Sequence, residues 1–357
     1  MTADLHRKPA NWRPYRLEES RDLGRPRPDL LAAAAGRLAT LEGVEAGSVR
    51  WRAGAPVVRP HSTLIPLVAE LAPGREIGAW QKVTYIPHID GQPDLGWADQ
   101  EKEGIERCRQ AEEEVRRRFG DSGGPLRLPA VWASDPETLT VVLSTVEGKP
   151  FGKVLALRPS YWMSQRRRFV RLGRAVELLE SLIPPPMPSI EETRAERRLA
   201  GALDLARRAG LPGSFIKPIE YRLCNLWDAL LASEAPTAYV HGDLSGSNVL
   251  WGKDGCVGLI DLGWKPRLRG FDLATYTVRL DLERPRLGWL TRRARADLEE
   301  GYGVGSYRAP GFLLERSQRL LRLLGEGAIV WSRRRPGAVL RELLDVENLY
   351  EARPQDC

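Results

Sequence analysis

The spacing of apolar residues along this chain becomes mainly helical after Gly148. Before that point, residues 62–71 and 79–86 have the length and composition of β-strands, and Pro73-Gly74 between them is a turn signal. After it, apolar residues recur at helical spacing, as in residues 161–182. These two kinds of spacing predict a sheet-rich part followed by a helical part.

The sheet-rich part also contains one long helical pattern. Residues 100–119 are rich in Glu and Arg, with apolar residues at helical spacing, and the turn residues of 121–125 end that pattern. Two further short strands are expected at 130–133 and 139–144. A helix within a mostly antiparallel sheet predicts an α+β lobe rather than a series of βαβ units.

The chain has 357 residues, which is long enough for two lobes. We expect an N-terminal arm with a short helix (residues 30–41) over 1–48, a sheet lobe over 49–148 and a helical lobe over 149–357. Within the helical lobe the spacing predicts helices at 161–182, 191–209, 219–232 and from 308 to the C-terminus.

The overall charge and the cysteines exclude several classes of protein. The formal net charge of +7 favours anionic partners, but the Arg runs alternate with acidic and apolar residues, as on solvated helix faces, and no nucleic-acid recognition motif accompanies them. The 4 cysteines have no paired spacing, so reduced thiols are expected. No apolar run of about 18 residues occurs. We expect a cytoplasmic protein without a membrane span or nucleic-acid partner.

Residues 239–263 read YVHGDLSGSNVLWGKDGCVGLIDLG and contain most of the candidate functional side chains. Two short apolar runs flank the turn residues 253–255, which predicts a β-hairpin. Asp243 precedes the first strand (residues 248–251), Asn248 begins it, and Asp261 follows the second strand (257–260). All three side chains are therefore expected at one end of the hairpin.

Two carboxylates and a carboxamide suit phosphoryl transfer from a nucleotide. Mg²⁺ prefers oxygen ligands, and Asn248 and Asp261 supply them. Asp243 is then available to orient a substrate hydroxyl and to accept its proton.

The compound motif resembles a known family. His241-Gly-Asp243-x-x-x-x-Asn248, with Asp261 thirteen residues later, is similar to the catalytic loop and metal motif of the aminoglycoside phosphotransferase and choline-kinase-like family. Protein kinases share these spacings but have Arg where this chain has Gly242. Asp272-Leu-Ala resembles an element found downstream in the same family.

The resemblance implies a bilobal protein-kinase-like fold, with a small antiparallel-sheet N-lobe and a larger, mainly helical C-lobe. It places the hinge near 143–148, the catalytic loop at 241–248 and the metal motif at 261–263. It implies Asp243 as the catalytic base and Asn248 and Asp261 as magnesium ligands. His241 and Asp272 would support the loop structurally.

The family template extends into the first lobe. Lys82 would pair with the nucleotide phosphates, and its partner would be Glu112, with Glu113 and Glu106 as alternatives. Residues 143–146 would contact the base through their backbone, so Leu143 and Val146 mark that stretch. Residues 71–78 contain no Gly-x-Gly-x-x-Gly loop.

We therefore predict an ATP- or GTP-dependent, magnesium-dependent small-molecule kinase acting on a hydroxyl of a sugar-like or amino-alcohol acceptor. The basic composition favours a neutral or anionic acceptor. The alternatives are an antibiotic (aminoglycoside-type) phosphotransferase and an inactive kinase-like nucleotide-binding scaffold.

Overall fold

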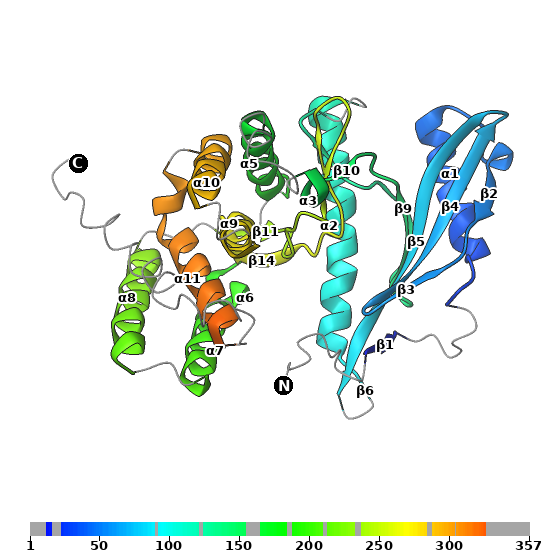
Figure 1. Cartoon of the computed structure of the whole chain (residues 1–357). Helices are drawn as coiled ribbons and strands as arrows, with labels where there is room; N and C mark the ends of the chain where they lie inside the picture. Colours follow the sequence, from blue (N-terminus) through cyan, green and yellow to red (C-terminus); the bar gives the residue numbers. More distant parts are fainter. Residues whose placement is uncertain are drawn as a thin grey trace. The chain divides into compact units, whose positions relative to one another are not determined.

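The chain forms two compact units in the computed structural model (Figure 1). One comprises residues 1–147 with Gly258–Ile260, and the other comprises 148–257 and 261–357. The structure describes residues 12–15, 23–89, 92–120, 124–154, 165–183, 188–209, 213–232, 237–283, 288–303 and 305–325. Residues 1–11 and 16–22 of the predicted N-terminal arm and residues 326–357 of the predicted C-terminal helical region lie outside these residues.

An antiparallel sheet with the strand order β2-β4-β5-β9-β8 forms the framework of the first unit. These strands are β2 (Arg50–Ala53), β4 (Ser62–Ala72), β5 (Arg75–Ile89), β9 (Thr140–Ser144) and β8 (Val131–Asp135), and the short strands β1 (Trp12–Pro14), β3 (Val57–Arg59) and β6 (Gln92–Pro93) pair beside them. The tight β4–β5 turn contains Gly74 at φ +79°, a left-handed conformation that favours glycine. The predicted hairpin is confirmed, whereas β2 and β3 were not predicted.

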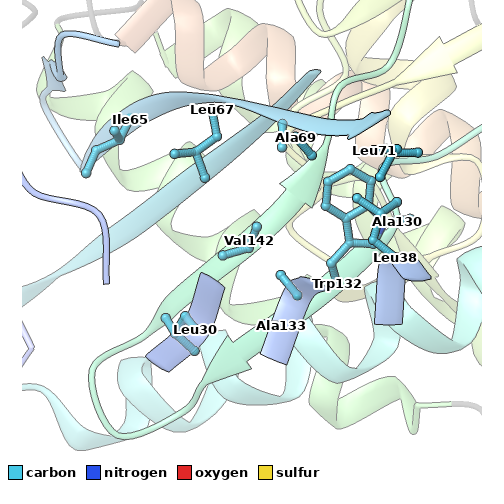
Figure 2. Packing of buried hydrophobic residues seen from close by; sticks show 12 residues of the cluster. Leu30, Leu38, Ile65, Leu67, Ala69, Leu71, Ala130, Trp132, Ala133 and Val142 are labelled. Atoms are coloured by element: carbon cyan, nitrogen blue, oxygen red, sulfur yellow. The ribbon is translucent and has the colours of Figure 1, made fainter. Parts of the chain in front are cut away.

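Helix α1 (Pro28–Glu42) supplies much of the apolar core of this unit. The helix ends at Gly43, whose φ of 67° allows its N–H to reach the carbonyl of Ala39. Figure 2 shows Leu30 and Leu38 in one cluster with side chains of the sheet. The other members of that cluster are Ala34, Ile65, Leu67, Ala69, Leu71, Ala79, Ala130, Trp132, Ala133 and Val142.

Helix α2 (Leu95–Phe119) follows β6 and confirms the long helical pattern. Asp94 caps its first turn by accepting a hydrogen bond from the Trp97 N–H at 3.1 Å. Its apolar positions Cys108, Ala111 and Val115 are buried, while most of its charged positions face solvent. The predicted α+β lobe with an antiparallel sheet is confirmed.

The second unit is mainly helical. Its helices are α3 (Phe151–Val154), α5 (Arg166–Glu180), α6 (Ile190–Thr193), α7 (Ala195–Arg208), α8 (Gly213–Ala232), α9 (Phe271–Glu283), α10 (Gly288–Tyr302) and α11 (Pro310–Gly325). Helices α5 and α10 approach closely through glycines. A Cβ on Gly173 would lie 2.2 Å from the carbonyl oxygen of Leu298, and one on Gly301 would lie 1.9 Å from that of Val170.

One predicted helix is divided in two. The spacing predicted a single helix over 191–209, but Arg194 has φ 54° and separates α6 from α7. Ser189 and Glu192 form a capping box on α6, so this short helix has its own N-terminal signal. No described helix is both long and apolar enough to cross a membrane.

Candidate active site

A two-stranded ladder brings two distant parts of the motif together in the second unit. Strand β11 (Thr237–Val240) pairs antiparallel with β14 (Lys265–Leu268), and Val240 lies opposite Lys265. The Gly263 N–H then donates to the carbonyl of His241 at 2.8 Å. The loop that follows β11 and the segment that precedes β14 therefore meet at one end of this ladder.

The start of the loop is held by a buried carboxylate at the N-terminus of α9. Asp272 accepts hydrogen bonds from the backbone N–H groups of His241 at 2.6 Å and Gly242 at 2.9 Å. Burial raises the pKa of Asp272. The electrostatic interaction with His241 and the hydrogen bonds from the two N–H donors oppose that rise. Gly242 has φ 83°, a value that favours glycine at the bend.

His241 is fully buried, and its Nδ1 accepts a hydrogen bond from the Asp243 N–H at 3.3 Å. A buried ring that bonds the loop backbone stabilises the conformation of the loop. This geometry agrees with the supporting function that the resemblance implies.

Asp243 and Asn248 lie side by side on the loop. The Asn248 Nδ2 group donates to the Asp243 backbone carbonyl at 3.0 Å and to its Oδ2 at 3.3 Å. The Asp243 side chain is 65% exposed, so its carboxylate is open to solvent. The sequence-predicted proximity of these two residues is thus found in the structure.

The oxygen donors of the predicted magnesium site suit a hard cation. Because Asn248 Nδ2 is bonded to Asp243, its Oδ1 is directed to the other side of the amide, where Ser247 Oγ donates to it at 3.4 Å. Asp261 is exposed and has φ 61°, a strained value for a residue other than glycine. Among the described residues no three His, Cys, Asp or Glu side chains converge as a metal site. A carboxamide and a carboxylate completed by phosphates and water remain compatible with Mg²⁺.

The strands β12 (Val249–Trp251) and β13 (Val257–Leu259) form where the hairpin was predicted. The Gly252 N–H donates to the Cys256 carbonyl at 3.0 Å and closes the turn, in which Gly255 has φ 81°. β12 also pairs with β10 (Lys149–Pro150). Asn248 lies directly before β12, although the sequence predicted it as the first residue of that strand, and Asp261 follows the end of β13 after Ile260.

A family model described as the phosphotransferase enzyme family (APH) matches residues 106–312. The chain belongs to this family. The match includes the whole loop 241–248, Asp261 and Asp272. The predicted phosphotransferase with a hydroxyl acceptor is therefore confirmed at the level of the family.

Solved structures of three phosphotransferases resemble the chain. The aminoglycoside phosphotransferase APH(3'')-Id from Streptomyces rimosus is 22% identical, with a TM-score of 0.44 over 80% of this chain and 97% of the other. A choline/ethanolamine kinase family protein from Mesorhizobium loti is 14% identical (TM-score 0.46; 90% and 95% covered). Choline kinase from Cryptosporidium parvum is 12% identical (TM-score 0.48; 90% and 95% covered). No curated protein matches the sequence.

Two ionisable side chains that bond the loop or the residue before α9 were not predicted from the sequence. Arg279 of α9 donates to Asp243 Oδ1 at 2.8 Å and to the Leu244 carbonyl at 3.1 Å. Glu180 of α5 accepts from the Gly270 N–H at 3.1 Å, directly before α9, and from Tyr302 Oη at 2.5 Å. Burial raises the pKa of Glu180 to about 8. The sequence signal that could have identified Arg279 is its position two helical turns after Asp272.

The first unit contains the predicted nucleotide contacts. Lys82 lies in β5 opposite Val141 of β9, and strand alternation places Leu143 on the same face as Val141. Lys82 and Leu143 therefore share a face of the sheet. Val146 follows the end of β9.

Of the three candidate glutamates on α2, only Glu112 is buried, at 7% exposure. Its carboxylate accepts a hydrogen bond from Arg116 at 2.7 Å. Glu113 is exposed and pairs with Arg37, and Glu106 is also exposed. Burial agrees with the choice of Glu112 but does not assign it a function.

A cavity of about 480 Å³ lies within the first unit. Glu112 and Val146 line it, together with Leu38, Trp132 and others, whereas Lys82 and Leu143 do not.

Proposed function

We propose that this phosphotransferase is a small-molecule kinase that transfers the γ-phosphoryl group of ATP or GTP to a hydroxyl of a sugar-like or amino-alcohol acceptor. The observation that carries the proposal is the exposed carboxylate of Asp243. Arg279 bonds one of its oxygens and Asn248 bonds the other. A carboxylate fixed in this way can receive a hydroxyl proton without first reorienting.

Asp243 would accept the proton as the acceptor oxygen bonds to phosphorus and the bond to the leaving nucleoside diphosphate breaks. Asn248 Oδ1 and Asp261 would hold Mg²⁺, which when bound neutralises phosphate charge. Asp272 and His241 keep the loop in place through backbone hydrogen bonds.

In the first unit, Lys82 would bind the phosphates, and Leu143 and Val146 would mark the stretch that contacts the base. Glu112 would be the partner of Lys82. Since Glu112 bonds Arg116 in the structure, that pairing requires Glu112 to share its carboxylate or to exchange partners.

A neutral or anionic acceptor fits the charges around the base. Arg279 places a guanidinium 2.8 Å from Asp243, and the chain as a whole carries a net charge of +7. The guanidinium offsets the negative charge of Asp243, and the positive net charge of the chain disfavours a polycationic acceptor.

The test is nucleotide turnover by the purified protein over a panel of sugars, amino alcohols and aminoglycosides, with Mg²⁺ and with excess chelator. We expect magnesium-dependent turnover with a neutral or anionic acceptor, reduced about 10³-fold in Asp243→Asn. Asp204→Asn changes a half-exposed helix carboxylate and is the matched control.

Turnover that Asp243→Asn leaves intact would contradict the assigned base, and an absence of turnover over the whole panel would favour the inactive scaffold. Protection of a susceptible bacterium from aminoglycosides, lost in Asp243→Asn, would overturn the acceptor class in favour of an antibiotic phosphotransferase.

A further inference from the structure

Helix α9 presents two side chains of opposite charge to the loop 241–248. Asp272 and Arg279 are seven residues apart, which is close to two turns of an α-helix, so both lie on the same face of α9. Asp272 bonds the loop at its first two residues, and Arg279 bonds it at the next two.

The two side chains bond complementary groups. The carboxylate of Asp272 accepts from two backbone N–H groups, and the guanidinium of Arg279 donates to the Leu244 carbonyl through Nη1. Since Arg279 Nη2 also donates to the Asp243 side chain, one residue fixes both the backbone and the carboxylate at this point.

The geometry favours a positioning function for Arg279 over direct substrate binding. Both terminal nitrogens of its guanidinium are bonded to the loop, and its side chain is 27% exposed against 65% for Asp243. Asn248 bonds the other carboxylate oxygen of Asp243, so the two bonds together define the plane of that carboxylate.

We infer that Arg279 is a positioning residue that clamps the catalytic loop onto α9 and orients Asp243 toward the acceptor hydroxyl. The inference rests on the proposed function for its kinetic consequence. The clamp itself is a property of the fold and can be measured without any acceptor. A small misplacement of the base is enough to lower the rate of phosphoryl transfer about 10²-fold.

The first measurement is steady-state kinetics of Arg279→Gln and Arg279→Lys. We expect Arg279→Gln to lower kcat about 10²-fold while the KM for the nucleotide changes less than about twofold, because only the orientation of the base is altered. Arg279→Lys keeps the positive charge but cannot make both hydrogen bonds of the guanidinium. Its kcat should therefore lie between those of Arg279→Gln and the wild type. Millimolar guanidinium ion should restore part of the activity of Arg279→Ala.

The second measurement is amide hydrogen exchange of peptides that cover residues 241–248. Arg279→Gln should increase their exchange rate about tenfold or more, since one of the two attachments to α9 is lost. The matched control is Arg208→Gln, which removes an exposed ion pair with Asp204 on α7 and should change neither measurement.

The two measurements separate the inference from the proposed function. Loop exchange and kcat that both remain at wild-type values in a folded Arg279→Gln protein would overturn the clamp. If the wild type turns over no acceptor, the proposed function fails, and loop exchange still decides whether Arg279 clamps the loop. Equal losses of kcat and of loop protection in Arg208→Gln would show a general effect on stability instead.

Discussion

The carboxyl groups of the two units respond to their surroundings in opposite directions. In the first unit, the hydrogen bond from Arg27 lowers the pKa of Asp29, and the bonds from Arg117 and Arg118 lower that of Glu114 to about 2. In the second unit, burial raises the pKa of four carboxyl groups, those of Glu180, Asp272, Asp297 and Glu315.

The difference reflects how each unit is stabilised. The first unit has an apolar core, and Glu112 is its only buried charged residue among those the structure describes. The second unit buries several ionisable residues. Asp272 accepts from the backbone of the loop 241–248, and Glu180 accepts from the Gly270 N–H directly before α9. Burial penalises the charged form of an ionisable group, which is why these pKa values are raised. The second unit therefore gives up stability to hold its loop in one conformation.

Removal of a buried carboxylate should have the largest effect. Asp272→Ala leaves the N–H groups of His241 and Gly242 without their acceptor, and we expect the free energy of unfolding to fall by about 4 kcal/mol. Phosphoryl transfer should be lost as well. Urea unfolding measures the change. Asp135→Ala in the first unit removes a partly exposed carboxylate and is the comparison. An equal loss in that variant would contradict the difference between the units.

Removal of apolar volume should affect the first unit next most strongly. Leu67 is 2% exposed in the core under α1, and Leu67→Ala should lower the free energy of unfolding by about 3 kcal/mol. Leu95→Ala, at a position 57% exposed, is the control and should change it by less than about 0.5 kcal/mol. A loss in Leu67→Ala no larger than in the control would show that this cluster does not stabilise the fold.

Near neutral pH, the pH dependence of the free energy of unfolding should come from Glu180 in the second unit. Glu180 has a folded pKa of about 8, raised above its ordinary value of 4.5. The folded state therefore binds a proton that the unfolded state has lost, and stability falls as pH rises through this window. We expect the free energy of unfolding to fall by about 2 kcal/mol between pH 6 and pH 8.

Glu180→Gln cannot lose a proton and should flatten this fall in urea titrations at several pH values. Glu177→Gln changes a half-exposed carboxylate on the same helix, which pairs with Arg269 at 3.0 Å, and should leave the slope unchanged. A slope that Glu180→Gln does not alter would assign the pH dependence to another group.

The smallest expected effect is a gain in stability at the proposed metal ligand. Asp261 has φ 61°, which glycine adopts without strain, so Asp261→Gly should raise the free energy of unfolding by about 1 kcal/mol. Turnover should fall sharply because a proposed magnesium ligand is lost. Asp261→Ala removes the same carboxylate and keeps the strain, so its thermal midpoint should lie below that of Asp261→Gly. Equal midpoints would show that the backbone there stores no strain.

Local signals made part of this structure predictable. The β4–β5 hairpin and α2 follow from apolar periodicity and from turn residues such as Gly74, which act within a few residues of the chain. Asp243 and Asn248 were identified because a fixed spacing on one loop sets their proximity. The break at Arg194 was not predicted, since the apolar spacing continues through it.

The contacts that support the loop had no such signal. Arg279 bonds Asp243 across 36 residues of sequence, and Glu180 bonds Gly270 across 90. Their positions depend on how α5 and α9 pack, and that packing is decided by the whole second unit.

From the sequence alone came the sheet-rich and helical parts, the β4–β5 hairpin, α2 and the oxygen-bearing side chains of the loop, because propensity, turn chemistry and spacing act locally. Only the tertiary structure decided which charges are buried and which atoms hold Asp243. Desolvation and long-range hydrogen bonds exist only once β11 has paired with β14 and α9 has packed beside the loop, so they leave no local trace in the sequence.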